Sequence, residues 1–464
     1  MNKLSFREKY SYGIGALGKD LAYAIVSSYL MIYFTDAIGL NPAFVGVLFL
    51  VARMWDAFND PMMGMVVDNT RSKWGKFRPW ILIGTVVNAA VVVFLFKKPN
   101  LEGNALYVYY SVMYILWGMT YTIMDIPYWS MIPSLSSDKE EREKISVIPR
   151  IFASSAWLLM GAFGLSLIDK LGNGNEIKGY ELLAIGVAVI FVIATLITVF
   201  NVKEQVEVKN NTEKVNFKET LNIIRKNDQL VVFIGIVLFM NLIMQIIGGV
   251  SLYYFKYVIG NDKLNQVFYA FSGLAEIGGL MLFPILTKKI GRQDVFKVGS
   301  VLPILGCSML LVFGIISPKN AAFIAVSGIV LKLGTGMLLG ATTVMLADVV
   351  DYGQFKLGTR NESIVFSVQT LLVKTASAVS GWLVGVGLSV VGYVPNAEQG
   401  ASTILGLRVL MIGLPILCAV LMYVIYKQKY KINGEFHDMI LNKLKNEKME
   451  KLLYNLQQKR FHTL

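Results

Sequence analysis

The stretch Arg53-Met-Trp-Asp56-Ala-Phe-Asn59-Asp60 lies inside the otherwise apolar run of residues 43–67. At 100° per residue, Arg53, Asp56 and Asp60 share one helical face, and Asn59 falls beside them. An ionisable side chain at the centre of a bilayer costs roughly 2.5 to 3.5 kcal/mol, so such charges must be paired, hydrated or bound to an ion. The stripe therefore indicates a functional site within a membrane-spanning helix.

Composition places the chain in a membrane. Its 464 residues are 55% hydrophobic and 16% charged, with a mean hydropathy of +0.55, which leaves too little polar surface for a soluble globule. Lys and Arg (44) exceed Asp and Glu (31), but the basic residues lie in short loops, as topology signals do, and indicate no nucleic-acid partner. Two cysteines and two histidines are too few for a disulfide framework, a zinc site or a histidine relay, and no cofactor is expected.

Apolar runs long enough to cross a bilayer recur twelve times between residues 10 and 426. The positive-inside rule places both termini in the cytoplasm. We therefore predict an all-α, multi-pass protein of the cell membrane, with six-helix bundles at 1–201 and 229–426 and a polar cytoplasmic linker at 202–228. Basic, glycine-bearing loops at 64–78 and 288–292 form a weak internal repeat, as in duplicated transporter folds. The tail, 427–464, is basic and amphipathic, and is expected to lie on anionic lipid or to cover the cytoplasmic mouth.

Gly13, Gly15 and Gly18 match the dinucleotide-binding pattern G-x-G-x-x-G. The pattern lies in a membrane span with no preceding strand, so a nucleotide site is not indicated. Small residues that let helices approach closely explain it better.

Further charges lie inside the apolar runs, at Lys19, Asp20, Asp125, Arg150 and Lys374. Together with the stripe around Asp56, their formal charges sum to zero. Since isolated charges are costly in a bilayer, we expect all of them to meet in one hydrated cavity near the cytoplasmic side.

Two kinds of chemistry are expected in this cavity. Asp56, Asn59, Asp60 and Thr122 offer only oxygen acceptors, which suit a small alkali cation. Tyr121, Asp125 and Trp129 repeat at i, i+4 and i+8, and a carboxylate, an arginine and an indole are what a pyranose requires. Gln369, Thr370 and Lys374 are expected to close the site from the second half. The alternative is a set of structural ion pairs beside a core aromatic stripe.

Several ordered strings resemble the glycoside-pentoside-hexuronide cation symporters of the major facilitator superfamily. They are Arg53 to Pro61, Asp68 to Trp80 with Trp74-Gly-Lys-Phe-Arg-Pro-Trp80, Tyr121 to Trp129, and Ala347 to Lys356. The resemblance covers nearly the whole chain up to the tail, and it implies the major facilitator fold, with twelve transmembrane helices in two six-helix bundles.

The resemblance also implies roles for individual residues. The coupling cation, Na⁺ or alternatively H⁺ or Li⁺, would bind Asp56, Asn59, Asp60 and Thr122. The sugar site would be lined by Lys19, Asp20, Tyr121, Asp125, Trp129, Arg150, Gln369, Thr370, Val373 and Lys374. Structural or gating roles are implied for Arg53, Asp68, Arg71, Gly75, Lys76, Asp348 and Asp351.

Three positions depart from the pattern of the melibiose-carrying members. Leu339 and Ser27 stand where those members have a tryptophan and a tyrosine, so two aromatic surfaces that would contact a second sugar ring are absent. Lys332 has no expected counterpart, and is predicted either to snorkel or to pair with Asp348.

The sequence thus predicts a cation-coupled symporter of a galactoside such as melibiose that works by alternating access. Alternatives on the same fold carry another glycoside, a pentoside, a hexuronide or an amphiphilic, lysolipid-like substrate. A membrane enzyme or receptor would need a catalytic nucleophile with its base, or a sizeable soluble domain, and neither is visible. The expected partners are the sugar, a monovalent cation and the lipid bilayer, with a cytoplasmic regulatory protein as a further candidate.

Overall fold

The structure is a computed structural model that describes residues 4–135, 139–204, 217–358 and 362–446. These residues form helices and no strand. The elements of the first part of the chain are α1 (Phe6–Ile32), η1 (Tyr33–Ile38), α2 (Pro42–Asp68), α3 (Arg78–Leu95), α4 (Gly103–Ser130), α5 (Ile132–Leu135), α6 (Lys139–Gly172) and α7 (Glu176–Asn201). The remaining elements are α8 (Phe217–Lys226), α9 (Asp228–Tyr253), η2 (Tyr254–Ile259), α10 (Lys263–Ile316), α11 (Ala321–Leu357), α12 (Glu362–Val390), α13 (Ala401–Arg408), η3 (Val409–Gly413) and α14 (Leu414–Lys429).

Local sequence sets several helix starts. Ser5 and Glu8 form a capping box at α1, in which the Ser5 hydroxyl accepts from the Glu8 N–H and the Glu8 carboxylate accepts from the Ser5 N–H. Asn41 caps α2, with Pro42 in the first turn, and Asn320 caps α11. Each cap satisfies backbone N–H groups that would otherwise lack a partner at the helix end.

Nine helices of the described residues are long and apolar enough to cross a membrane. One of them, Lys263–Ile316, contains two spans, because Gly291 (φ +83°) interrupts it with a backbone conformation that favours glycine. The helices α2 and α4 are not among the nine, although they have 27 and 28 residues. Counting Lys263–Ile316 as two spans and adding α2 and α4 gives the twelve spans predicted from the sequence. The charged stripe lies on α2.

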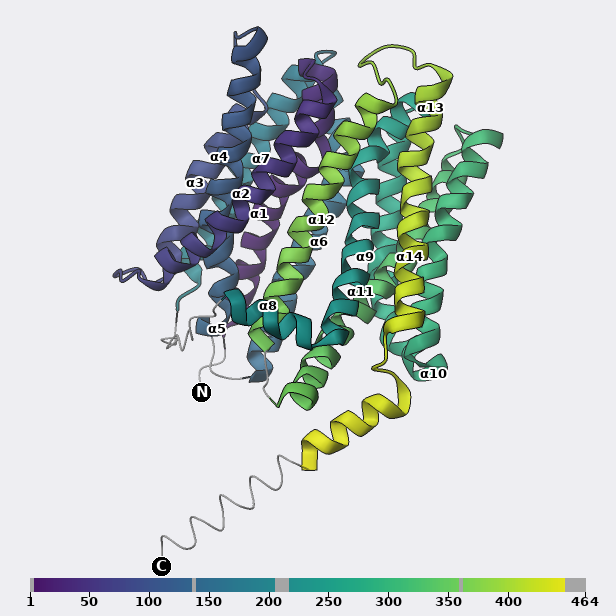
Figure 1. The fold of residues 1–464 in the computed structure, drawn as a ribbon. Helices are drawn as coiled ribbons and strands as arrows, with labels where there is room; N and C mark the ends of the chain where they lie inside the picture. The colour runs from purple at the N-terminus through teal and green to yellow at the C-terminus, as the bar shows by residue number, and fades with distance from the viewer. Residues whose placement is uncertain (1–3, 136–138, 205–216, 359–361, 447–464) are drawn as a thin grey trace, which may run out of the picture.

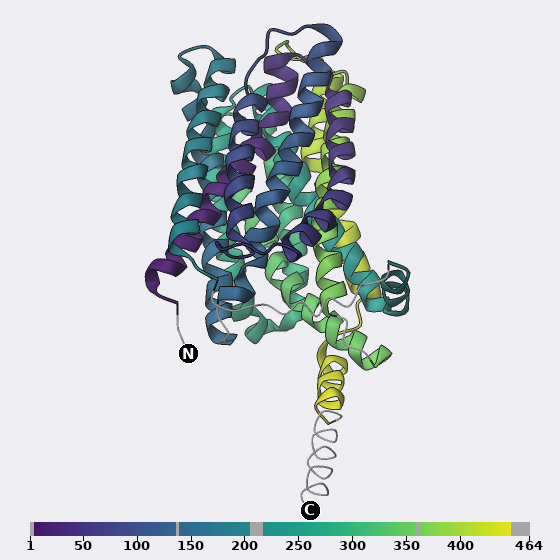
Figure 2. The same ribbon diagram turned by 90° about the vertical axis from the view of Figure 1, so that its left-hand side faces the viewer.

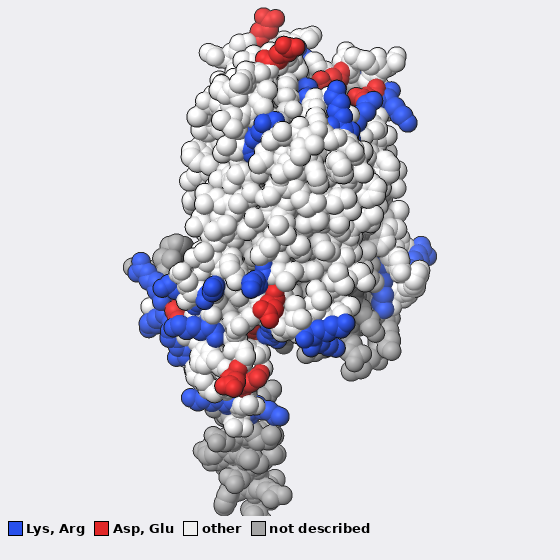
Figure 3. Space-filling view, turned by 90° about the vertical axis from the view of Figure 1, so that its right-hand side faces the viewer, with Lys and Arg blue, Asp and Glu red and all other residues white. Residues whose placement is uncertain are grey.

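The surface agrees with insertion in a bilayer. On the face shown in Figure 3, the broad middle of the molecule is nearly free of charged side chains, which gather toward the two ends. A wide apolar band between two charged rims is typical of a protein surrounded by lipid.

The helices run roughly parallel, and the two ends of the chain lie at the same end of the bundle (Figures 1 and 2). Helices from the two parts of the chain pack as the pairs α2 with α12, α6 with α10 and α1 with α9. Between α2 and α12 the approach is close, because a Cβ on Gly46 would lie 3.0 Å from the Cα of Gly385.

The glycine pattern near the N-terminus serves helix packing, as predicted. A Cβ on Gly15 would lie 2.3 Å from the Thr198 hydroxyl, and one on Gly18 would lie 2.6 Å from the Ala194 Cβ. Both contacts bring α1 against α7.

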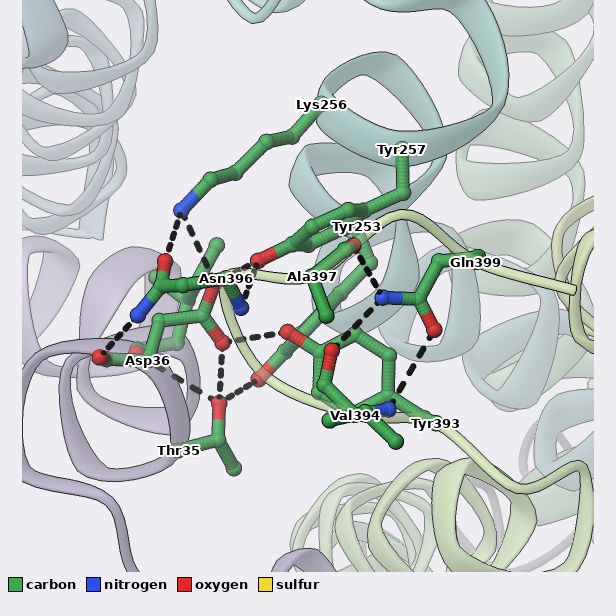
Figure 4. A network of polar contacts seen from close by, with 11 residues as sticks. Thr35, Asp36, Tyr253, Lys256, Tyr257, Tyr393, Val394, Asn396, Ala397 and Gln399 are labelled. Carbon is green, nitrogen blue, oxygen red and sulfur yellow. Dashed lines mark hydrogen bonds and ion pairs between the residues drawn. The ribbon is translucent and has the colours of Figure 1, made fainter.

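A polar network ties the two groups of helices together at the end opposite the termini (Figure 4). The Asp36 carboxylate, at the end of the first span, accepts from the Tyr393 hydroxyl at 2.5 Å, from the Tyr257 hydroxyl and from Lys256 Nζ at 2.9 Å. The side-chain amide of Asn396 donates to the Asp36 carbonyl at 2.7 Å. The Asp36 side chain is fully buried. Four groups from the second part of the chain thus donate to this one residue. The network closes this end of the molecule.

Replacing Asp36 by alanine is expected to loosen this end, since breaking a buried charge pair costs about 3 to 5 kcal/mol. The test uses a Cys307→Ser, Cys418→Ser chain with Ser27→Cys in the central cavity, and a membrane-impermeant maleimide added from the side opposite the termini. Labelling should be at least tenfold faster in Asp36→Ala, whereas Glu102→Ala, an exposed carboxylate on the same end, should change nothing. Equal labelling rates in all three chains would contradict a closing role for Asp36.

At the end that carries the termini, acidic side chains hold the loops. Lys76 Nζ lies 2.8 Å from Asp68. The Glu204 carboxylate accepts from the backbone N–H groups of Lys76 at 2.8 Å and Phe77 at 2.9 Å. Gly75 has φ +102°, and a Cβ there would lie 2.4 Å from a Glu204 oxygen, so the loop requires glycine.

The expected pairing of Lys332 with Asp348 is wrong. Both residues lie on α11, sixteen positions apart, which is about 24 Å along a helix axis and beyond the reach of a lysine. Asp348 instead lies 3.0 Å from Arg292 and 3.2 Å from His437, while Lys332 lies 2.9 Å from Glu276.

The described part of the tail packs on the protein. Residues 434–446 are helical, Ile440 is fully buried in the second core cluster, and the Phe436 ring lies 6.3 Å from that of Tyr352. Lys443 Nζ lies 4.9 Å from the Phe355 ring centre. These contacts place this helix against the terminal end of α11. The apolar positions 449–456, also predicted to be amphipathic, lie outside the described residues.

Candidate functional site

A cavity of about 440 Å³ lies between the two groups of helices. Its volume is within the range of small-molecule sites, roughly 300 to 1,000 Å³. The first part of the chain contributes Ser27, Arg53, Tyr114, Trp117 and Trp157, among others. The second part contributes Asn241, Gln245, Tyr269, Glu276, Lys332 and Leu339, among others. All three positions that depart from the family pattern, Ser27, Lys332 and Leu339, therefore line this cavity.

The predicted sugar residues of the first half form a compact cluster. Lys19, which is 3% exposed, lies with its Nζ 2.9 Å from Asp20 and 2.8 Å from Asp125, and donates to the Tyr121 hydroxyl at 3.4 Å. The same ammonium lies 4.9 Å from the Trp129 ring centre, a cation–π contact. One lysine between two carboxylates and two aromatic rings offers donors, acceptors and an apolar face together.

Trp129 provides a graded test of this cluster. Trp129→Phe keeps a ring and is expected to weaken sugar binding by about 0.5 to 1.5 kcal/mol, the value of an aromatic contact, and Trp129→Ala should weaken it more. The measurement is the sugar dissociation constant of the three purified chains. Equal constants for all three would show that the ring does not contact the sugar.

The predicted cation residues also come together. The Thr122 hydroxyl, on α4, donates to Asp60 Oδ1 at 3.0 Å, and the other Asp60 oxygen forms an ion pair with Lys374 of α12. Asp56, which is 4% exposed, has its Oδ2 2.9 Å from Arg53. The Nδ2 of Asn59 is buried without a hydrogen-bond partner. The oxygen donors fit a small cation, which would compete there with the basic side chains.

Arg53 joins the charged stripe to the cavity. Its Nη1 contacts Asp56, its Nη2 donates to the Tyr23 hydroxyl at 3.2 Å, and its guanidinium lies 5.5 Å from the Trp117 ring centre. Arg53 therefore contacts the charged stripe and lines the cavity at the same time.

The other predicted residues differ in how exposed they are. Arg150 and Thr370 are exposed, Val373 is 40% exposed, and Gln369 is half-buried. The charges expected to share one cavity form ion pairs of Lys19 with Asp20 and Asp125, of Arg53 with Asp56, and of Asp60 with Lys374. The Tyr23 ring lies between the first two sets, 5.2 Å from the Tyr121 ring and 5.8 Å from the Arg53 guanidinium.

The sequence reasoning missed three acidic residues, namely Asp36, Glu204 and Glu276. A signal existed for Glu276, because it is the only charged residue between positions 264 and 287. A lone carboxylate inside a span calls for a partner within the membrane, and Lys332 provides it.

Parallel helices in two packed groups, a cavity between them with polar side chains in its wall, and charge clusters within the spans define a membrane transporter. The fold is shared with a bacterial homologue of the human lysosomal transporter Spinster in an inward-facing, unoccupied conformation. That structure has a TM-score of 0.68 and 13% identity, and covers 92% of this chain and 97% of its own.

The family model described as MFS/sugar transport protein matches residues 11–434, and the chain belongs to this family. It is 32% identical over 417 residues to an isoprimeverose transporter of Lactiplantibacillus pentosus, covering 89% of this chain and 86% of that protein. It is 29% identical over 476 residues to a lactose permease of Lactobacillus helveticus, covering 96% of this chain and 73% of that protein. The chain is thus a sugar symporter of the major facilitator superfamily, of the glycoside-pentoside-hexuronide type, in the cell membrane, and not an enzyme.

Proposed function

We propose that the chain carries a galactoside such as melibiose together with Na⁺, by alternating access. The observation that carries this proposal is the pairing of two sites, with the Lys19–Asp125 cluster beside the Asp56, Asn59, Asp60 and Thr122 set. Tyr121 and Thr122 are adjacent on α4 and belong one to each site. A change at either site is therefore felt at the other, as coupling requires.

Lys374 provides a physical basis for the coupling between the cation site and the sugar site. Its ammonium belongs to the second half of the chain and neutralises Asp60 of the first half. A sodium ion at Asp60 would displace the ammonium and free Lys374 to face the sugar. Binding of the cation would thus change a contact between the two halves, whose relative movement is what alternating access needs.

The termini are proposed to lie in the cytoplasm, which makes the end closed by Asp36 the outer one. Domain limits at 201 and 229 follow from the same topology. A regulatory protein in the cytoplasm would meet the loops and the tail at the terminal end.

The test of substrate class is uptake into membrane vesicles of radiolabelled α- and β-galactosides, a pentoside, a glucuronide and a lysolipid, under an imposed sodium gradient. Accumulation of a galactoside above that of the other classes supports the proposal. Accumulation of another class in its place identifies the alternative on the same fold, and overturns the galactoside assignment.

A further inference from the structure

The second half of the chain lines the cavity with a polar wall that lies outside the cation site and the Lys19 cluster. Asn265, Tyr269, Ser272 and Glu276 are spaced at i, i+4, i+7 and i+11, which places them on one face of α10. All four line the cavity, together with Lys332 of α11.

This wall contains polar groups without partners. Asn265 Oδ1 and Ser272 Oγ are buried, at 3% and 0% residue exposure, and neither has a hydrogen-bond partner. Leaving a buried polar atom unpaired costs about 1 to 3 kcal/mol, so such atoms commonly mark a place that a ligand or water fills. Tyr269 is already bonded, with its hydroxyl 3.1 Å from Ser251 Oγ.

The charged members of the wall form the Glu276–Lys332 ion pair. Lys332 Nζ lies 2.9 Å from Glu276 Oε2, and the two side chains are 11% and 22% exposed. The backbones of α10 and α11 also pack closely here, because a Cβ on Gly336 would lie 2.1 Å from the Glu276 carbonyl oxygen. Buried ion pairs contribute little net stability compared with apolar packing. What the pair does supply to the cavity is further donors on the ammonium and further acceptors on the carboxylate.

Other groups complete a sugar-binding surface. Asn241 and Gln245 of α9 are spaced at i, i+4 and present amides to the same cavity. The Trp157 indole of α6 also lines it and is 40% exposed, so an apolar ring faces the space. Amides, an ion pair and an indole around one cavity match the alternating hydroxyl and C–H surfaces of a pyranose.

The cavity that this wall lines comes close to the Lys19 cluster at Trp157. The Tyr23 ring lies 5.2 Å from that of Tyr121, which belongs to the cluster, and 5.9 Å from that of Trp157, which lines the cavity. One aromatic side chain therefore separates the two regions.

We propose that this wall, together with Asn241 and Gln245 of α9, is a second sugar subsite. It binds the distal unit of a neutral disaccharide or trisaccharide whose first unit binds at Lys19 and Asp125. The distal unit is neutral because Glu276 and Lys332 cancel each other and leave no unpaired charge on the wall. This inference rests on the proposed sugar transport, and it names oligosaccharides as the preferred class over monosaccharides.

The test compares a one-unit with a two-unit ligand. Dissociation constants for methyl α-galactoside and for melibiose are measured on the purified full-length chain and on Glu276→Gln and Gln245→Ala. In Glu276→Gln, melibiose binding should weaken about tenfold, as expected for loss of a charged hydrogen-bond acceptor, while methyl α-galactoside binding stays unchanged. Gln245→Ala leaves the ion pair intact and should weaken melibiose selectively by a smaller factor.

If Glu276→Gln weakens the binding of methyl α-galactoside and melibiose equally, Glu276 only holds the helices and the subsite is overturned. If neither variant changes the dissociation constant of either ligand, the subsite is overturned as well. Tighter wild-type binding of phenyl β-glucuronide than of melibiose would overturn the neutral assignment. If the wild-type chain binds no sugar, the proposed function is overturned instead. The methyl α-galactoside measurement on the wild-type chain distinguishes this outcome from failure of the subsite alone.

Discussion

Asp125→Ala is expected to abolish sugar binding while sodium binding persists. The sugar loses a charged acceptor, and two hydroxyl contacts at about 1.5 to 3 kcal/mol each correspond to at least a hundredfold loss of affinity. The cation site keeps its ligands, because Asp56 and Asp60 lie on α2 and Thr122 faces Asp60. Lys19 also keeps a counter-ion, since its Nζ lies 2.9 Å from Asp20.

The measurement is calorimetric titration of the purified variant with sugar and, separately, with sodium. Glu102→Ala, which removes an exposed carboxylate at the end opposite the termini, serves as the control and should bind both ligands as the wild-type chain does. Unchanged sugar affinity in Asp125→Ala would contradict the assignment. Loss of both ligands would mean that Asp125 supports the fold of the cluster.

Asn59→Ala is expected to lose sodium stimulation and to retain sugar uptake driven by a proton gradient. A proton binds a single carboxylate oxygen covalently, whereas sodium needs several oxygen ligands at once and so depends on the neutral oxygens of Asn59 and Thr122. The Nδ2 of Asn59 is buried without a partner, so its position is not explained by hydrogen bonds within the protein.

Initial uptake is measured in the variant under an imposed sodium gradient and then under an imposed pH gradient. Full sodium stimulation would show that Asn59 is not a ligand. Loss of both modes would show that the side chain holds the helix and not the ion. The matched control is Asn69→Ala, which changes an exposed asparagine at the end of α2. It should keep both sodium-driven and proton-driven sugar uptake.

Helical periodicity predicted the parts of the site that lie on single helices. The spacing of Asp56 and Asp60 on α2, and of Tyr121, Asp125 and Trp129 on α4, follows from 3.6 residues per turn. The predicted shared cavity did not specify that Thr122 contacts Asp60 or that Lys19 contacts Asp125, which the structure shows. Their roles as ligands remain predictions.

Contacts between helices could not be predicted in the same way. Pairing across helices depends on rotation and depth, which one sequence does not specify, so Glu276 was not matched to Lys332. The Asp36 network joins residues more than two hundred positions apart, and its donors include two tyrosines with no charge to mark them. Glu204 lies at the start of the linker region, where a charged residue is expected in any case.

The most direct test of coupled transport is whether a sugar gradient alone moves sodium. The purified chain is reconstituted into proteoliposomes with equal sodium on both sides, melibiose is added outside, and entry of radioactive sodium is followed. We predict sodium entry that rises with the sugar gradient, disappears in Asn59→Ala and Asp125→Ala, and persists in Glu102→Ala. Sodium entry that is the same with and without sugar, while the sugar itself is taken up, would contradict coupling of the two sites.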